Sequence, residues 1–128
     1  MLPRAQRLVK PSDFTRAFRK GRAQSDDLLL AKVLTRKEPG FRLGVSVGKK
    51  VGPSVVRNRV KRRLREATRS VSPELKVPVD LVLVAKLPAS GASYADLRGS
   101  LVRLLSRAGV LQAPRGEPDP GRSERAGE

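Results

Sequence analysis

The chain has 128 residues and no cysteine or histidine, and its 28 Lys and Arg against 12 Asp and Glu give a formal net charge of +16. This length is typical of one domain, and a domain of this size can fold without disulfides or structural metals. The missing cysteines exclude disulfides and thiolate metal sites. The sequence holds no run of about 18 apolar residues that could span a membrane and no apolar signal-peptide run after its basic N-terminus, so we expect a cytoplasmic protein.

The first predicted element is a short helix. Residues 1–10 are basic and irregular, and Ser12 is a plausible N-cap for a helix from Asp13 to about Lys20. Gly21 is expected at the C′ position that ends it. Its apolar face consists of positions i, i+3 and i+4, which are Phe14, Ala17 and Phe18.

Two strands and a second helix are predicted next. Residues 28–34 are apolar apart from Lys32 and are followed by a Pro39-Gly40 turn, which indicates a strand. Residues 42–49 alternate in polarity, so we expect a second strand that pairs with the first as a hairpin. Ser54 is a possible N-cap for a helix that continues to about Ser70.

The third strand and the last helix have clear signals. Residues 79–86 are almost continuously apolar, which is typical of a strand buried on both faces. Ser93 with Asp96 three residues later forms a predicted capping box, and Gly109 is expected at the C′ position of the helix. The apolar stripe of this helix is Tyr94, Leu97, Leu101, Leu104, Leu105 and Ala108.

The element order helix, strands, helix, strand, helix indicates an α+β fold without internal repeats. From Gln112 onward Pro, Gly, Arg and Glu dominate and no apolar periodicity remains. We therefore expect a domain over residues 1–111 and a disordered tail over residues 112–128.

Positive charge is concentrated in residues 49–69, which read KKVGPSVVRNRVKRRLREATR. At 100° per residue, one side of this helix is apolar and the polar residues occupy an arc roughly 140° wide. Like charges at i and i+4 repel, and phosphates would reverse that repulsion because Arg binds them bidentately. We therefore predict that this face binds nucleic acid, with an anionic membrane surface as the second candidate partner. The alternative without a binding function is a basic face that contacts only solvent. The residues on the arc are Arg57, Asn58, Lys61, Arg62, Arg65 and Arg69.

This segment resembles the bacterial ribonuclease P protein family. VVRNRVKRRLRE, preceded by LGVSVGKKVG, is similar to the signature of that family. The resemblance extends to KPSDFTRAFRKG on the N-terminal side and to VDLVLVAKLPAS and SYADLRGSLVRLL on the C-terminal side, and covers roughly residues 4–110 in the family's order and spacing.

The resemblance implies a small α/β sandwich with a mostly antiparallel sheet and three helices, similar to a ribosomal-protein domain, with a left-handed βαβ crossover around the basic helix. It implies a protein cofactor that binds the catalytic ribonuclease P RNA and the single-stranded 5′ leader of precursor tRNA. Mg²⁺ bound by the RNA would perform the hydrolysis, with no cofactor held by the protein. The residues that carry over as contacts to the catalytic RNA are Lys49, Lys50, Arg57, Asn58, Arg59, Lys61, Arg62 and Arg65.

The resemblance also implies a leader-binding cleft between the first helix and the sheet, with Phe14 and Phe18 as its aromatic residues. Without the resemblance, two aromatics at i and i+4 are more often core, although a ring can pack on one side and stack a base on the other. Lys32 replaces an aromatic that many relatives carry, and Leu87 replaces a second basic residue. Leader binding is therefore expected to depend more on charge than on stacking.

Catalysis by the protein itself is not expected. Histidine, the commonest general base, is absent, and the carboxylates are scattered. Asp26 and Asp27 are adjacent, and adjacent residues on a strand point to opposite faces, so this pair should not share a metal. A ribosomal or other structural RNA-binding protein is the alternative function, and the KKVGPSVVRNRVKRRLRE run favours ribonuclease P over it. Neither DNA nor a membrane is an expected partner.

Overall fold

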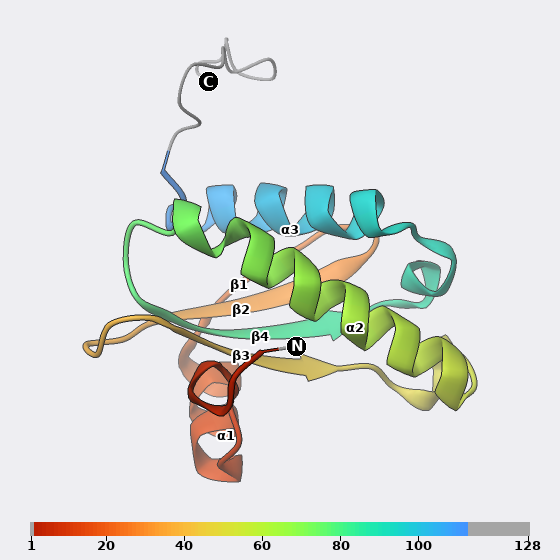
Figure 1. Ribbon diagram of the computed structural model, residues 1–128, viewed down its shortest axis with the longest axis horizontal. Coiled ribbons are helices and arrows are strands. Elements are labelled where there is room, and N and C mark those ends of the chain that lie inside the picture. Colours follow the sequence, from red (N-terminus) through yellow and green to blue (C-terminus); the bar gives the residue numbers. More distant parts are fainter. Residues whose placement is uncertain (1, 113–128) are drawn as a thin grey trace, which may run out of the picture.

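The computed structural model describes residues 2–112 (Figure 1), so the expected disordered tail of residues 112–128 lies outside the described part of the chain except for Gln112, whose amide donates to the carbonyl of Glu74 at 2.8 Å. The helices and strands are α1 (Pro11–Lys20), β1 (Arg22–Ser25), β2 (Leu29–Thr35), β3 (Phe41–Ser46), α2 (Ser54–Val71), β4 (Val79–Ala85) and α3 (Tyr94–Arg107). Short 3₁₀ turns lie at η1 (Arg4–Gln6), η2 (Lys49–Val51), η3 (Ser72–Glu74) and η4 (Leu87–Gly91).

The four strands form one mixed sheet in the order β1-β2-β4-β3. β1 pairs with β2 and β2 with β4 in antiparallel fashion, whereas β3 and β4 are parallel. With β3 and β4 pointing up and α2 in front of the sheet, β4 lies to the left of β3 (Figure 1), so the β3–α2–β4 crossover has the uncommon left hand. The expected α+β class, with a mostly antiparallel sheet, is confirmed.

The expected hairpin between residues 28–34 and 42–49 is wrong, because β4 lies between β2 and β3. β4 is buried at almost every position, on both faces, and an apolar strand of that kind belongs in the centre of a sheet. The actual hairpin joins β1 and β2, and the sequence RAQS of β1 has no apolar alternation that predicts a strand. β3 is also shorter than expected, since the chain enters η2 at Lys49.

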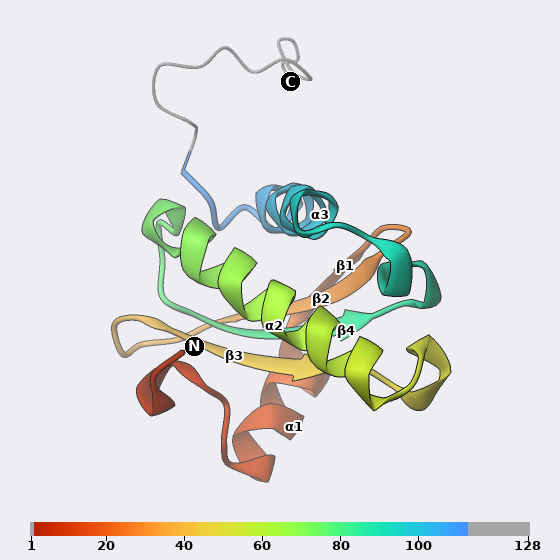
Figure 2. The same ribbon diagram turned by 45° about the vertical axis from the view of Figure 1, so that its right-hand side comes forward.

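Helices cover both faces of the sheet. α2 and α3 lie over one face and α1 over the other (Figure 2), with the main core between the sheet and the α2–α3 pair. Alternation along β2 matches this arrangement, because Leu29, Ala31 and Val33 are buried in the core while Lys32, between them, faces the α1 side. No helix within residues 2–112 is both long and apolar enough to cross a membrane.

The N-terminal residues close one edge of the sheet. Leu2 is buried in the core, and Arg7 forms a parallel bridge with Leu43 of β3. The amide of Leu8 also donates to the carbonyl of Leu43 at 3.0 Å. The segment expected to be irregular therefore satisfies part of the free edge of β3.

Two predicted helix ends are confirmed in α3. The Ser93 hydroxyl accepts from the Asp96 amide at 3.0 Å and the Asp96 carboxylate accepts from the Ser93 amide at 3.2 Å, which is the predicted capping box. Gly109 follows the C-cap residue with a φ of 77°, the left-handed conformation that glycine adopts most easily.

The N-caps expected at Ser12 and Ser54 are wrong. α1 begins at Pro11 with Lys10 as N-cap, and α2 begins at Ser54 itself with Pro53 as N-cap. Neither cap residue makes a side-chain hydrogen bond to its helix. Proline fixes the backbone angle that a first helical turn needs, so both helices start beside a proline in place of a hydroxyl cap.

Gly21 ends α1 for a different reason from the expected C′ role. It is the C-cap, and its φ of −68° is open to any residue. A Cβ at this position would lie 2.5 Å from the carbonyl oxygen of Ala17 and 3.0 Å from the amide nitrogen of Val33. Glycine therefore allows the end of α1 to meet the backbone of β2 directly.

Candidate nucleic-acid interface

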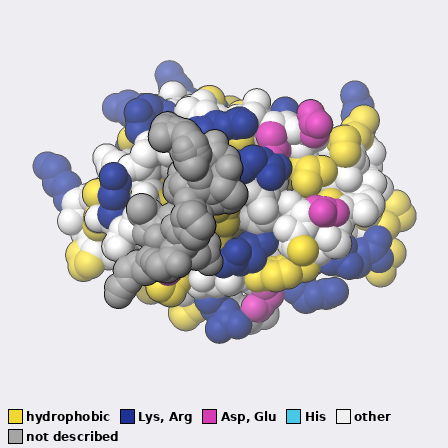
Figure 3. Space-filling model, turned by 90° about the horizontal axis from the view of Figure 1, so that it is seen from above, with side chains coloured by type: hydrophobic (Ala, Val, Ile, Leu, Met, Phe, Trp, Pro, Cys, Tyr) yellow, Lys and Arg dark blue, Asp and Glu magenta, His cyan; other side chains and the backbone are white. Residues whose placement is uncertain are grey.

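α2 separates an apolar side from a cationic one. Val60, Leu64, Ala67 and Val71 are buried in the core. At 100° per residue, the polar arc begins beside Leu64 and turns from there toward solvent. Seen from above, Lys and Arg side chains lie around the edge of the visible face, among hydrophobic and other side chains (Figure 3). The predicted basic ridge, which we define as Arg57, Asn58, Lys61, Arg62, Arg65 and Arg69, therefore stands on the outer surface of α2.

The cations of the basic ridge differ in how strongly the protein holds them. Within residues 2–112, no hydrogen bond or ion pair engages the side chains of Lys61, Arg62 or Arg65. Arg69 forms an ion pair with Glu66 at 2.9 Å, which lowers the pKa of the Glu66 carboxyl and raises that of Arg69. The middle of the ridge is thus the part that is open to an outside anion.

The Arg57 side chain is hydrogen-bonded to the loop that precedes α2. Its Nε donates to the carbonyl oxygen of Gly52 at 3.0 Å, and its Nη2 donates to the Ser54 hydroxyl at 3.3 Å. A Cβ at Gly52 would lie 3.0 Å from Val56, so glycine lets this loop turn tightly onto the helix. Arg57 therefore helps to hold the loop that carries Lys49, besides being available to an anion through its free nitrogen.

The loop residues Lys49 and Lys50 lie in η2, just before α2, and both are exposed. Asn58 is also exposed, on the outward arc of the helix. Arg59 lies just outside the basic ridge, roughly 60° around α2 from Arg62 and one turn before Arg63, whose Nη1 donates to the carbonyl of Ala92 at 2.6 Å. The structure thus places five of the eight sequence-predicted residues on one arc of α2, Lys49 and Lys50 in the loop before the helix, and Arg59 beside the arc, one turn before Arg62.

A second surface lies where α1 crosses the other face of the sheet. The register puts Lys32 of β2, Val82 of β4 and Gly44 of β3 in one row across this face. A Cβ at Gly44 would lie 2.7 Å from the ring of Phe14, so Phe14 packs directly on the β3 backbone. With Gly21 against β2 at its other end, α1 crosses the sheet from β3 to β2.

The two aromatics of α1 have different surroundings. Phe14 is half-buried over Gly44, whereas Phe18 is 39% exposed. The Lys32 ammonium lies 5.1 Å from the centre of the Phe18 ring, in cation–π range. Phe18 and Lys32 therefore offer a ring and a positive charge side by side, next to solvent.

The next row of the sheet, Leu30, Val84 and Ser46, lies on the same face. We use the name α1 cleft for the surface made of Phe14, Phe18 and Lys32 with this row, without implying a measured hollow. Leu30 and Val84 are half-buried and Ser46 is exposed. Ser46 ends β3, and the chain then enters η2, which carries Lys49.

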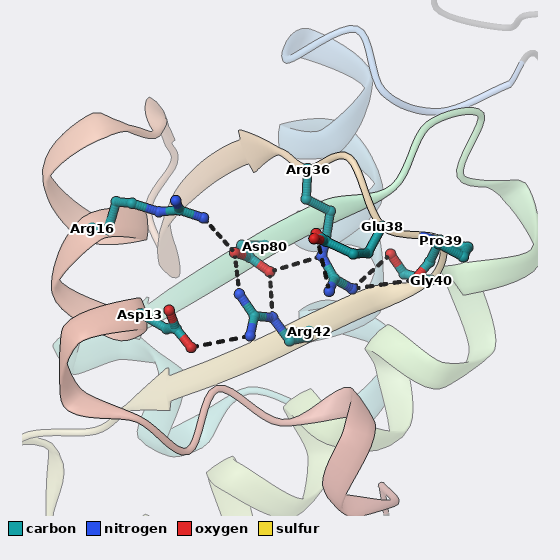
Figure 4. A network of polar contacts seen from close by, with 8 residues as sticks. All are labelled: Asp13, Arg16, Arg36, Glu38, Pro39, Gly40, Arg42 and Asp80. Carbon is teal, nitrogen blue, oxygen red and sulfur yellow. Dashed lines mark hydrogen bonds and ion pairs between the residues drawn. The ribbon is translucent and has the colours of Figure 1, made fainter.

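The opposite side of α1 carries a polar network that the sequence analysis did not identify (Figure 4). Asp80 of β4 is fully buried and accepts two hydrogen bonds from Arg42 of β3, each 2.8 Å long. Hydrogen bonding to Asp80 raises the pKa of Arg42 above its ordinary value. The available signal was a single acid inside the apolar run VDLVLVA, since a buried charge requires a partner.

Asp26 and Asp27 lie in the turn between β1 and β2, not on a strand. The Asp26 carboxylate accepts from the Ser100 hydroxyl at 2.6 Å, from Arg103 at 2.9 Å and from the amides of Leu28 and Leu29. It therefore fastens the hairpin to α3. Within residues 2–112, no three acidic side chains come together as a possible metal site.

A family model described as Ribonuclease P matches residues 2–109 of the chain. The Ribonuclease P protein component of Clostridium kluyveri is 40% identical over 108 residues, which covers 83% of this chain and 96% of that protein. The Ribonuclease P protein component of Bacillus cereus is 33% identical over 110 residues, or 85% of this chain and 96% of the relative.

Solved structures of two such proteins are similar to this fold. The RNase P protein of Staphylococcus aureus superposes with a TM-score of 0.76 at 32% identity, covering 85% of this chain and all of that one (100%). The RNase P protein of Thermotoga maritima superposes with a TM-score of 0.71 at 26% identity, covering 79% of this chain and 96% of its own.

Proposed function

The chain belongs to the ribonuclease P protein family, and from that membership we propose how its two surfaces serve the holoenzyme. As the protein component of ribonuclease P, it is a subunit of the holoenzyme that processes the 5′ ends of tRNA, with ribonuclease P RNA and precursor tRNA as its partners. The alternative of a ribosomal or structural RNA-binding protein is not favoured by these relatives.

The basic ridge of α2, with the preceding loop, binds the catalytic RNA in this proposal. The observation that carries it is that Lys61, Arg62 and Arg65 have no partner within residues 2–112 although they stand in a row on the outer surface. Phosphates of a folded RNA would neutralise these charges and release counterions. The full contact set is Lys49, Lys50, Arg57, Asn58, Arg59, Lys61, Arg62 and Arg65.

The α1 cleft binds the single-stranded 5′ leader of precursor tRNA in this proposal. A ring beside an ammonium suits a single strand, because the ring stacks on a base and the ammonium meets a phosphate. The exposure of Phe18 and the 5.1 Å contact with Lys32 support this role. Phe14 contributes mainly by packing α1 onto β3.

Hydrolysis is assigned to the RNA subunit, with Mg²⁺ held by that RNA and no catalytic residue in this chain. The protein has no histidine to act as a general base. Its role is to bind and to orient the leader and the catalytic RNA, in the cytoplasm, where bacterial tRNA is matured. Purified protein free of RNA should therefore leave precursor tRNA uncut, and 5′ maturation that survives removal of all RNA would refute the assignment.

Reconstitution tests the proposed function directly. The purified protein is added to a bacterial ribonuclease P RNA, and cleavage of precursor tRNA is assayed at low Mg²⁺. We expect the protein to restore cleavage that the RNA alone loses, since cations of the basic ridge take over part of the charge neutralisation. A protein that binds the RNA but never raises cleavage would instead fit a structural RNA-binding role.

Leader length tests the cleft. Affinity of the holoenzyme is compared for precursor tRNA with a leader of several nucleotides and for the same tRNA with a one-nucleotide leader. Phe18→Leu keeps bulk but removes the ring, and it should weaken only the long-leader substrate, by about tenfold. Lys32→Ala should act in the same direction. Equal losses on both substrates, or none, would assign these residues to the core or to the solvated surface.

A further inference from the structure

The buried carboxylate of Asp80 is the centre of a chain of charges that leads from the sheet to α1 (Figure 4). Asp80 and Arg42 are neighbours across the parallel strands β4 and β3. Arg42 donates Nε to one carboxylate oxygen and Nη2 to the other, both at 2.8 Å. This two-point contact fixes the plane of the guanidinium group.

The remaining nitrogen of Arg42 points at α1. Its Nη1 donates to the carboxylate of Asp13, in the first turn of the helix, at 3.1 Å. Arg16, one turn later, brings its Nη2 to 3.9 Å from Asp80. One residue of α1, Asp13, is thus linked to the buried carboxylate through Arg42, and a second, Arg16, approaches it directly.

Arg36 touches the same carboxylate without reaching α1. Its Nε lies 3.6 Å from Asp80, and the other contacts of its side chain are Glu38 and the carbonyl oxygens of Pro39 and Gly40. Glu38, Pro39 and Gly40 all belong to the β2–β3 connection (Figure 4). Arg36 therefore provides a natural comparison, since it shares Asp80 but not the link to the helix.

The link lies on the side of α1 that faces away from the α1 cleft. At 100° per residue, Phe18 is roughly 140° to 160° around the helix from Asp13 and Arg16. A contact on that side resists rotation of α1 about its axis, and rotation is the motion that would press the Phe18 ring into the sheet or swing it into solvent. The apolar contacts beneath the helix, such as Phe14 on Gly44, are less directional.

Stability alone does not explain the network. A buried ion pair is often no more stabilising than apolar side chains of similar size, because both charges lose their hydration. A hydrogen-bonded chain from Asp80 through Arg42 to Asp13 does, however, select one orientation of α1 against the sheet. An orienting contact is most useful beside a surface that has to meet a ligand.

We propose that Asp13, held by Arg42 and Asp80, is a positioning residue for leader binding, which fixes the rotation of α1 that keeps the Phe18 ring open beside Lys32. The inference rests on the proposed function of the α1 cleft and adds the residues that determine its geometry. Asp13 does not touch the leader, and it acts through Phe18.

The test uses the reconstituted holoenzyme and the two leader lengths. Asp13→Ala should weaken binding of the long-leader substrate by about threefold to tenfold, up to the loss caused by Phe18→Leu, and leave the one-nucleotide leader unchanged. Arg36→Ala is the matched control, because it removes another partner of Asp80 and should leave the affinity for both leaders unchanged. Thermal unfolding of each free protein verifies that the variants are folded.

A double-variant cycle separates positioning from a direct contact. If Asp13 acts through the ring, Asp13→Ala should have little further effect in a Phe18→Leu protein. Full additivity of the two losses, equal losses on both leader lengths, or an unchanged long-leader affinity in Asp13→Ala would each overturn the positioning role. If Phe18→Leu itself leaves long-leader binding unchanged, the assignment of the cleft fails first, and the positioning role fails with it.

Discussion

The ring of Phe14 on α1 occupies the space that a side chain at Gly44 of β3 would need, since a Cβ built on Gly44 would lie 2.7 Å from two ring carbons. The contact lets the helix approach the sheet closely enough for the network around Asp80 to form. It also identifies Gly44 as a position where the smallest possible addition should disturb the α1 cleft.

We expect Gly44→Ala to destabilise the protein by about 1–3 kcal/mol, because the added methyl group must displace the ring or the helix. Chemical denaturation measures the effect. Gly48→Ala is the control, since a Cβ there has nothing within 4 Å and the φ of −74° suits alanine. A shift of less than about 0.5 kcal/mol is expected for it. Equal stabilities for the two variants would mean that α1 does not pack as described.

Asp80 should be among the most costly polar residues to remove. Asp80→Ala leaves Arg42 and Arg36 without their buried partner, and breaking a buried pair in this way costs about 3–5 kcal/mol. Urea denaturation is the measurement. Asp13→Ala, at the half-exposed end of the same network, should cost about 1 kcal/mol or less. A mild effect of Asp80→Ala would show that the charges are better hydrated than the structure indicates.

The basic ridge can be tested by charge-matched pairs. Arg62→Ala with Arg65→Ala removes two unpartnered cations of α2, and should lower the slope of log affinity against log salt by about 1.4–1.8 for the catalytic RNA. Lys37→Ala with Lys76→Ala removes the same charge from exposed positions at the other end of the sheet. That control should leave the slope nearly unchanged. Identical slopes for the two double variants would mean that RNA binding depends only on the net charge of the protein.

Acid should weaken the attachment of the β1–β2 turn to α3. Burial alone would raise the pKa of Asp26, but the Ser100 hydroxyl, the amides of Leu29 and Leu28, and Arg103 lower it from 3.8 to about 2. Because the folded pKa is depressed, the carboxylate stabilises the protein above its unfolded pKa, and this stabilisation is lost as the pH falls through about 2.

The measurement is the difference in unfolding free energy between the native chain and Asp26→Asn at several pH values. We expect a difference of about 1–2 kcal/mol near pH 6 that shrinks as the pH falls below 4. Asp27→Asn is the control, because Asp27 is exposed beside Asp26, and its difference should stay near zero. A difference for Asp26→Asn that does not depend on pH would contradict the assignment of the shift.

Local patterns were sufficient for most elements and for the basic ridge. The capping box at Ser93, the apolar run of β4 and the left-handed glycine at Gly109 each depend on residues within a few positions of one another. The cationic arc of α2 follows in the same way from helical periodicity alone. The hydrogen-bonding and packing needs of these segments are met within the segment, so the sequence by itself determined them.

Only the tertiary structure decided how the strands are ordered and what surrounds α1. The apolar run of β4 indicates a central strand, but which two strands it separates depends on pairing between segments that are distant in the sequence. The hydrogen bond of Arg42 to Asp80 joins residues 38 positions apart. The packing of Phe14 on Gly44 exists only once β3 has paired with β4. The exposure of Phe18 follows from these long-range contacts, because the rotation of a helix on a sheet is determined by both partners and not by the helix alone.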